Sequence, residues 1–285
     1  MVRARGLIAQ ALAYAAALLA GAAVLSLLGG ESLVAMAAAD VAATAVVFAF
    51  SLALSNSSLY DPYWSVAPPA LFAAWIAWGE PSARSWLALA LVCLWSARLT
   101  WNFLRGWRGL EHEDWRYRDL RAKTGPAYWV VSFLGIHFFP TVLTFGGSLS
   151  LWVVATAGHR PLGAMDAAAL VVTLAAIAIE AIADQQLRRF VLSKPPEGAI
   201  LNTGLWRYSR HPNYFGEVLF WWGLFLFALA ADPSRAWVVI GPIAITALFA
   251  LISVPMIDRR MALRRPAYAE HARRVPAIVP WFPRR

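Results

Sequence analysis

The hydrophobic positions of this chain are gathered into long runs, and short polar segments separate them. A run of about 20 apolar residues can cross the hydrocarbon core of a bilayer, about 30 Å thick, as a helix. A longer run at 127–157 contains Gly146-Gly147, and a shorter run at 66–79 is counted as a further span. Six more runs have the required length: 7–29, 34–55, 84–104, 164–187, 213–231 and 235–257. The pattern predicts an all-α, polytopic transmembrane bundle of seven or eight spans.

The chain is expected to form one membrane-embedded domain over residues 1–285. It has no internal repeat and no linker long enough to separate two domains. The apolar run that follows MVRARG is longer than the core of a secretory signal, and it is not followed by a cleavage site and a soluble domain, so a first span is predicted. The single Cys93 rules out an internal disulfide and a cysteine-based zinc site.

The basic residues predict the orientation of the bundle. The net charge is +9, and 21 of the 25 Lys and Arg residues fall in four segments: before the first span, and in 105–126, 188–212 and 257–285. An eight-span chain with a cytoplasmic N-terminus places all four on the cytoplasmic side, as the positive-inside rule requires. Both termini are therefore expected to be cytoplasmic. Because topology explains the excess charge, nucleic-acid binding is not expected.

Ionisable residues occur within the spans or at their edges, and most lie toward the predicted cytoplasmic side. Such residues cost about 2.5–3.5 kcal/mol each at mid-membrane, so they are usually paired or functional. Only Asp40 lies nearer the opposite side; the others are Asp61, Arg98, Glu180, Asp184, Glu217 and Asp258. They predict a polar chamber open to the cytoplasm. The structural alternative is that Arg98 neutralises one carboxylate and locks the bundle.

The stretch GLWRYSRHPNYFGE, residues 204–217, concentrates polar chemistry at the mouth of a span. The residue before a proline avoids the helical region, so His211 should end an extended segment and a helix should begin near Pro212. A helix N-terminus beside Arg207 and Arg210 suits a phosphate-bearing ligand, and contact with anionic lipid headgroups is the alternative.

The sequence lacks the common motifs for binding a nucleotide or a metal. No dinucleotide-binding glycine motif or P-loop is present, so any nucleotide would be bound by the membrane bundle. His112 and His137 lack a third ligand at metal spacing, so no metal is expected. The mixed charges and aromatic residues of 105–126 favour an amphipathic surface helix.

Four stretches resemble bacterial membrane proteins grouped with the steroid 5-alpha-reductase family. They are 204–217, SNSSLYDPYWSVAPP at 55–69, IADQQL at 182–187 and the C-terminal 267–283. The resemblance covers roughly 50–285 and leaves 1–49 as extra N-terminal spans. It implies a multi-pass protein of the bacterial inner membrane. The 204–217 motif is also similar to isoprenylcysteine carboxyl methyltransferases and, more distantly, to sterol reductases.

The resemblance implies an NADPH-dependent reductase that acts on the C=C bond of a lipophilic enone taken from the bilayer. It assigns proton donation to Asp61, with Tyr60. Trp95 stands where steroid reductases have a tyrosine, and an indole N–H cannot serve as an acid. The NADPH ligands that it implies are Arg98, Asn102, Asp184, Tyr208, Arg210, His211, Asn213, Tyr214, Glu217 and Arg260.

Two other functions stay open at this point. One is an S-adenosylmethionine-dependent methyltransferase, although the residues Met256 to Arg259 depart from the Glu-Glu pair usual in that family. The other is a transporter or scaffold without chemistry. The number of arginines around the predicted chamber favours NADPH, because that cofactor carries several negative charges.

Overall fold

The structure, a computed structural model, describes residues 2–30, 32–79, 81–157 and 160–284. The described residues are helical or irregular and contain no strand, so the all-α prediction is confirmed. The chain forms two compact units, Met1–Gly158 and His159–Arg285. Each unit is described by itself below.

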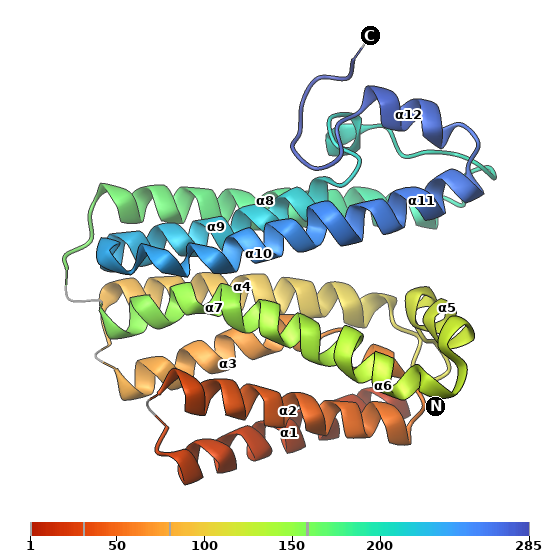
Figure 1. The fold of residues 1–285 in the computed structure, drawn as a ribbon. Coiled ribbons are helices and arrows are strands. Elements are labelled where there is room, and N and C mark those ends of the chain that lie inside the picture. Colours follow the sequence, from red (N-terminus) through yellow and green to blue (C-terminus); the bar gives the residue numbers. More distant parts are fainter. Residues whose placement is uncertain (1, 31, 80, 158–159, 285) are drawn as a thin grey trace. The chain divides into compact units, whose positions relative to one another are not determined.

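The described residues of the first unit form seven α-helices. Helices α1 and α2 pack side by side as an antiparallel pair, while α3 packs on α4 and α7 (Figure 1). A 3-10 turn at Ser57–Leu59 precedes α3, and a π-helical turn at Phe133–Phe138 joins α6 to α7. The helices are α1 (Val2–Leu28), α2 (Leu33–Ala53), α3 (Tyr63–Trp78), α4 (Ala83–Gly106), α5 (Trp115–Thr124), α6 (Tyr128–Ser132) and α7 (Phe139–Thr156).

The second unit contains a long pair of helices and a C-terminal segment. Its α-helices are α8 (Ala164–Leu192), α9 (Pro212–Ala231), α10 (Ile240–Ala247), α11 (Val254–Arg264) and α12 (Tyr268–Arg274). A π-helical turn, Leu248–Ser253, joins α10 to α11. Short 3-10 helices at Gly204–Arg207 and Pro233–Val239 precede α9 and α10.

Local sequence signals explain where several helices begin. Ser32 caps α2 by accepting from the Ala35 backbone N–H, and Ser82 caps α4 in a reciprocal arrangement with Ser85. Pro212 occupies the first position of α9, as the sequence predicts, because a proline has no N–H to leave unsatisfied there.

Seven helices of the described residues are long and apolar enough to cross a membrane. This agrees with the prediction of an integral, multi-pass protein. The run 66–79 forms most of α3, whose 16 residues extend about 24 Å, less than a full hydrocarbon core. Helix α7 continues through Gly146-Gly147 without a break. Within the segment 105–126, the predicted surface helix is α5.

Helices α8 and α9 approach each other closely because glycines face α8. A Cβ atom placed at Gly216 would lie 2.8 Å from the Glu180 Cβ and 2.9 Å from the Ala176 carbonyl oxygen. At Gly223, the same atom would lie 2.3 Å from the Thr173 Oγ1. The glycines thus allow the backbones of α8 and α9 to lie close together, and Gly216 does so near the start of α9, beside Asn213 and Glu217.

Candidate functional site

The two basic residues before α9 bind a carboxylate of the same unit. Arg210 Nη2 donates to Asp258 Oδ2 over 2.6 Å, and His211 Nε2 lies 2.8 Å from Asp258 Oδ1. The Tyr268 hydroxyl donates to the same Oδ1. Burial and the Asp258 carboxylate raise the pKa of Tyr268. Asp258, which was singled out in the sequence only as a charge closing a span, is therefore the centre of this cluster.

The same residues hold the C-terminal segment. The Arg210 backbone N–H donates to the Pro276 carbonyl over 2.9 Å, and the His211 N–H donates to the Ala277 carbonyl over 3.1 Å. Arg210 Nη1 donates to two further carbonyls near the end of α12, and Tyr208 accepts from the Trp281 N–H. These contacts tie Arg210 and His211 to the C-terminal segment, and the Arg210 Nε is buried without a hydrogen-bond partner. Their assignment as NADPH ligands stays a prediction.

Two predicted cofactor residues lie together at the start of α9. Asn213 Nδ2 donates to Asp184 Oδ1 on α8 over 3.3 Å. The other half of this amide, Asn213 Oδ1, is buried and has no hydrogen-bond partner. Glu217 is 4% exposed, one turn further along α9, and accepts from the Trp221 indole over 2.9 Å. The pair of α8 and α9 therefore keeps one amide acceptor open.

Tyr214 and Arg260 complete the predicted residues of this unit. The Tyr214 ring stacks on the His211 imidazole with centroids 5.3 Å apart, and its centroid lies 4.7 Å from that of the Phe249 ring. Arg260 lies on α11, two residues after Asp258. Tyr214 thus extends the aromatic and charged cluster around Asp258.

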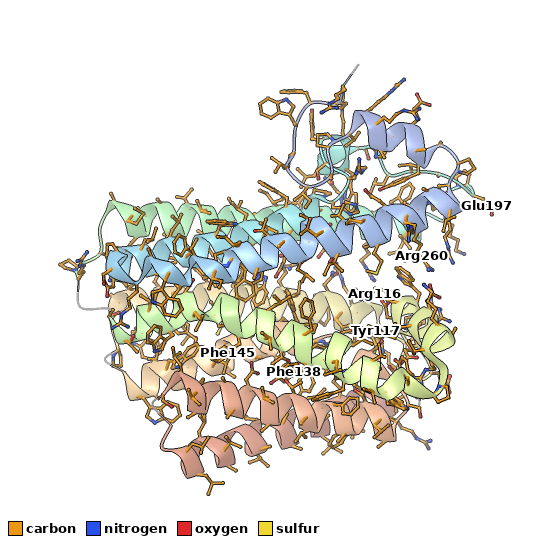
Figure 2. The ribbon with its side chains drawn as sticks, viewed as in Figure 1. Arg116, Tyr117, Phe138, Phe145, Glu197 and Arg260 are labelled. Atoms are coloured by element: carbon orange, nitrogen blue, oxygen red, sulfur yellow. The ribbon has the colours of Figure 1, made fainter. Side chains whose placement is uncertain are left out.

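Asp61, the predicted acid, lies in the turn before α3 and outside the spans. Its carboxylate accepts from the Tyr117 hydroxyl, and Tyr117 projects with Arg116 from the first turn of α5 (Figure 2). Burial raises the pKa of Asp61 to about 6, against the opposing effects of the Arg116 charge and the Tyr117 hydrogen bond. One Asp61 oxygen is thus already engaged by α5.

The remaining predicted residues of the first unit are separate from Asp61. Tyr60 is buried, and its hydroxyl lies 2.8 Å from the Thr141 Oγ1 on α7. Asn102 accepts from the Arg105 guanidinium, one turn further along α4, and Arg98 lies one turn before it. The gathering of these residues with those of the second unit into one chamber stays a prediction.

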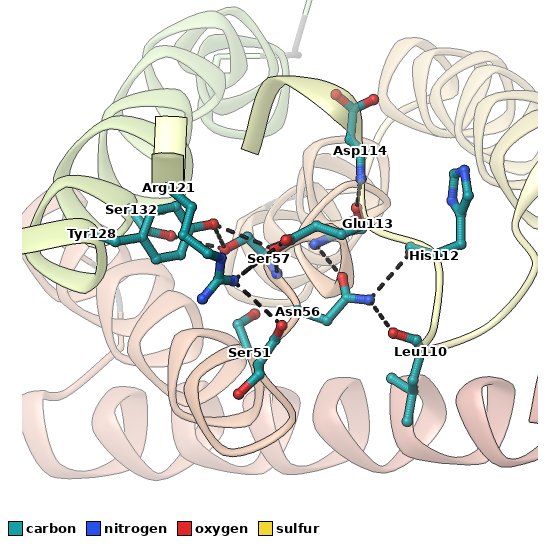
Figure 3. A network of polar contacts seen from close by, with 12 residues as sticks. Ser51, Asn56, Ser57, Leu110, His112, Glu113, Asp114, Arg121, Tyr128 and Ser132 are labelled. Atoms are coloured by element: carbon teal, nitrogen blue, oxygen red, sulfur yellow. Dashed lines mark hydrogen bonds and ion pairs between the residues drawn. The ribbon is translucent and has the colours of Figure 1, made fainter. Parts of the chain in front are cut away.

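A dense polar network ties the loop before α5 to the turn before α3 (Figure 3). The Glu113 carboxylate accepts from the Ser57 N–H over 2.8 Å and from Arg121 over 3.1 Å. The Asn56 amide donates to two carbonyls of the loop, and the Arg121 guanidinium lies 4.0 Å from the Tyr128 ring centroid. Glu113 is paired with a cation, and the network spans three segments, so we interpret it as a structural lock.

A cavity of about 610 Å³ lies between α1, α2 and α3. Its lining is mostly Ala, Gly and Leu, and among the residues that the structure describes Asp40 is the only formally charged one that lines it. Asp40 Oδ1 accepts from the Tyr63 hydroxyl over 2.6 Å, and Asp40 Oδ2 is buried without a partner. The lining residues run from Tyr14 to Gly30 along α1 and the turn after it, and from Tyr63 to Trp78 on α3. The site joins an apolar volume to one carboxyl group that has a buried oxygen without a hydrogen-bond partner.

The sequence contained both members of this pair but did not connect them. Asp40 lies nearer the opposite side of the predicted membrane than the other ionisable residues. Tyr63 directly follows the Tyr60-Asp61-Pro62 segment, to which the resemblance assigns the proton donor. The available signal was an aspartate within an alanine-rich span, LVAMAAADVAATAVV, where a charge needs a partner. Its partner is 23 residues away, and only the packing of α3 beside α2 reveals it.

Comparisons with known proteins identify a family and a relative of this chain. It is 28% identical over 263 residues to an uncharacterized protein of Schizosaccharomyces pombe, covering 82% of this chain and 76% of that relative. No solved structure matches it. A family model described as a protein of unknown function, DUF1295, matches residues 47–275, which include Tyr63, Asn213 and Asp258. With most of its length matched by this model, the chain belongs to the DUF1295 family.

Proposed function

We propose that the protein is an NADPH-dependent reductase of the C=C bond in a lipophilic enone. The observation that carries this proposal is the Asp40–Tyr63 pair on the wall of an apolar cavity. Such a cavity favours a lipophilic ligand, and a few polar groups then fix its orientation. The resemblance of residues 204–217 to steroid 5-alpha-reductases supports the same reaction class.

In this proposal Asp40 carries a proton on Oδ2, while Oδ1 is held by the Tyr63 hydroxyl. The O–H group donates to the carbonyl oxygen of the enone and withdraws electron density from the conjugated C=C bond. As the β carbon gains a hydride, Asp40 passes its proton to the oxygen, and the resulting enol rearranges to the saturated ketone. The carboxylate left behind keeps the Tyr63 hydrogen bond and is reprotonated from water.

The start of α9 suits the carboxamide of a nicotinamide. Asn213 Oδ1 is an open buried acceptor, and an amide N–H is the donor that complements it. Asn213 would therefore hold the carboxamide, with Asp184 fixing the orientation of the Asn213 amide. When bound, NADPH supplies the hydride. Arg98, Asn102, Tyr208, Glu217 and Arg260 remain proposed ligands of the rest of the cofactor.

The test uses the purified full chain in detergent, with NADPH and a 3-oxo-Δ4 steroid or a long-chain enone as probes. Asp40→Asn should lower single-turnover NADPH oxidation by about two to four orders of magnitude, the usual contribution of a positioned acid, and leave NADPH binding intact. Asp119→Asn on α5 is the matched control and should behave like the wild type.

Cofactor binding is tested separately by titration. Asn213→Ala should weaken NADPH binding at least tenfold, because a buried hydrogen-bonding partner typically contributes about 1–3 kcal/mol. Wild-type turnover by Asp40→Asn would refute the assignment of the acid. Tight binding of S-adenosylmethionine, without binding of NADPH, would replace the reductase with the methyltransferase alternative.

A further inference from the structure

The end of the chain forms a strap, residues 275–284, that is fixed beside the entrance of α9. The Trp281 backbone N–H donates to the Tyr208 carbonyl, four residues before α9 begins, over 2.9 Å. The Arg284 N–H donates to the carbonyl of Arg274, the last residue of α12, over 2.8 Å. These bonds fix the second half of the strap against the segment that leads into α9.

Three large apolar side chains project from the fixed part of this strap. Val279 is 63% exposed, Trp281 is 70% exposed and Phe282 is 71% exposed. The Phe282 and Tyr208 rings meet nearly at right angles, with centroids 5.8 Å apart. Because hydrogen bonds hold the backbone here, the apolar surface is a fixed feature of this unit, and such a patch marks an interaction site.

The hydrogen bond to Tyr208 sets the depth of these side chains relative to a membrane. Helix α9 (Pro212–Ala231) is a candidate span, so the residues just before Pro212 lie where the chain enters the bilayer. Trp281, whose backbone is bonded to Tyr208, therefore lies at the level of the lipid headgroups. Tryptophan is enriched at this level because its ring is amphipathic. The membrane interface is thus the partner that suits the exposed side chains.

A pocket of about 380 Å³ lies beside the strap, between α12 and the segment that leads into α9. Arg207 lines it from the 3-10 helix before α9, and Arg274 lines it from the last turn of α12. Among the described residues Arg207 makes no ion pair, whereas Arg274 pairs with Glu270 over 2.7 Å. Glu270 is the only carboxylate among the described lining residues, so the lining holds two guanidinium groups and one negative charge. Guanidinium groups bind phosphate oxygens through paired N–H donors, so the pocket suits a phosphate.

We propose that this pocket binds the phosphate of an anionic phospholipid headgroup, while Trp281 and Phe282 enter the membrane interface beside it. A phospholipid explains both features together, because its phosphate lies at the level of the strap and its acyl chains lie deeper. A soluble phosphate would occupy the pocket but would leave the apolar side chains uncovered. The sequence predicts this side of the membrane to be cytoplasmic, where anionic lipids attract arginines. The proposal is independent of the reductase reaction.

The first test measures lipid binding to the purified full chain by native mass spectrometry. The probes are phosphatidylglycerol and phosphatidylcholine with identical acyl chains, and the wild type should bind phosphatidylglycerol at least tenfold more tightly. Arg207→Gln and Arg274→Gln should each weaken this binding about fivefold, the usual contribution of one cation near an anionic surface. Glu270→Gln should strengthen it, because it removes the negative charge from the lining. Arg273→Gln is the matched control, since Arg273 is an exposed cation of α12 outside the lining.

The second test measures the depth of the strap in nanodiscs that contain brominated phosphatidylglycerol. A bimane dye attached at Phe282→Cys, in a chain that also carries Cys93→Ser, should be quenched by the bromine atoms. The same dye at Glu197→Cys, an exposed position in the loop between α8 and α9 (Figure 2), should be quenched much less.

Several results would overturn the proposal. They are equal affinity of the wild type for the two lipids, a loss in Arg273→Gln as large as that in Arg207→Gln, and equal quenching at the two dye positions. Competition supplies a further one: inorganic phosphate or NADPH that displaces phosphatidylglycerol at equimolar concentration would assign the pocket to a soluble phosphate compound in place of a lipid.

Discussion

The contact of Gly216 with α8 allows a sharp test of how the start of α9 is held. In Gly216→Ala, the new Cβ would lie 2.8 Å from the Glu180 Cβ, 2.9 Å from the Glu180 N and 2.9 Å from the Ala176 O. Carbon atoms in ordinary contact are about 3.5–4.0 Å apart. All three neighbours are backbone atoms or a Cβ, so no side-chain rotation relieves the clash. Helix α9 must move by roughly 0.7 Å from α8.

The expected cost combines two opposing effects. Overpacking of this kind costs about 1–3 kcal/mol, and rigid neighbours place the value toward the upper end. Replacing Gly with Ala within a helix returns up to about 1 kcal/mol. The free energy of unfolding should therefore fall by about 1–2 kcal/mol. The same movement breaks the Asn213–Asp184 hydrogen bond, already 3.3 Å long, so NADPH affinity should fall too.

Gly146→Ala on α7 is the matched control, because nothing lies within 4 Å of the Cβ position there. This variant should be neutral or stabilised by up to about 1 kcal/mol. Unfolding of both variants by SDS in mixed micelles, followed by circular dichroism, measures the difference. If Gly216→Ala were as stable as Gly146→Ala, the close approach of α8 and α9 would not exist as described, and the reasoning would be refuted.

Two further predictions concern charged residues. Asp258→Asn should speed hydrogen exchange of backbone amides in 265–284, because it removes the carboxylate that binds Arg210, His211 and Tyr268. Glu270→Gln, which breaks only an exposed ion pair, should leave this exchange unchanged. Equal protection of these amides in both variants would contradict the prediction. For Asp61, the folded state holds its proton up to a pKa of about 6 and the unfolded state only to about 3.8, so stability should fall as pH rises between these values. The thermal midpoint of the wild type should decline relative to Asp61→Asn over this range, and parallel curves would rule out a buried Asp61.

Much of the helical layout could be predicted from the sequence because it depends on local patterns. The runs 34–55 and 213–231 became α2 and α9 within two residues at each end. Apolar length and a proline at the first turn are properties of the chain itself. The start of α9 at Pro212 followed directly from His211-Pro212.

The polar partners were harder to predict because they depend on packing between distant segments. Asp258 meets Arg210 across 48 residues, and Tyr60 meets Thr141 across 81. No spacing rule connects such residues. The motif predicts Arg210 and His211 as ligands of a cofactor, and nothing in it indicates that both also contact a carboxylate on α11.

Asp40 and Asp61 are the same residue type in the same unit, but their surroundings make them unequal as candidate proton donors. Asp61 lies in a turn, accepts from Tyr117 and has the Arg116 cation near it, and these two contacts oppose the rise in pKa that burial causes. Asp40 lines a cavity of mostly small apolar residues, and one of its oxygens is buried without a hydrogen-bond partner. A proton donor needs a free oxygen beside the substrate and no cation that would stabilise the carboxylate before reaction. Asp40 meets both requirements and Asp61 does not, so turnover should depend on Asp40 far more strongly than on Asp61.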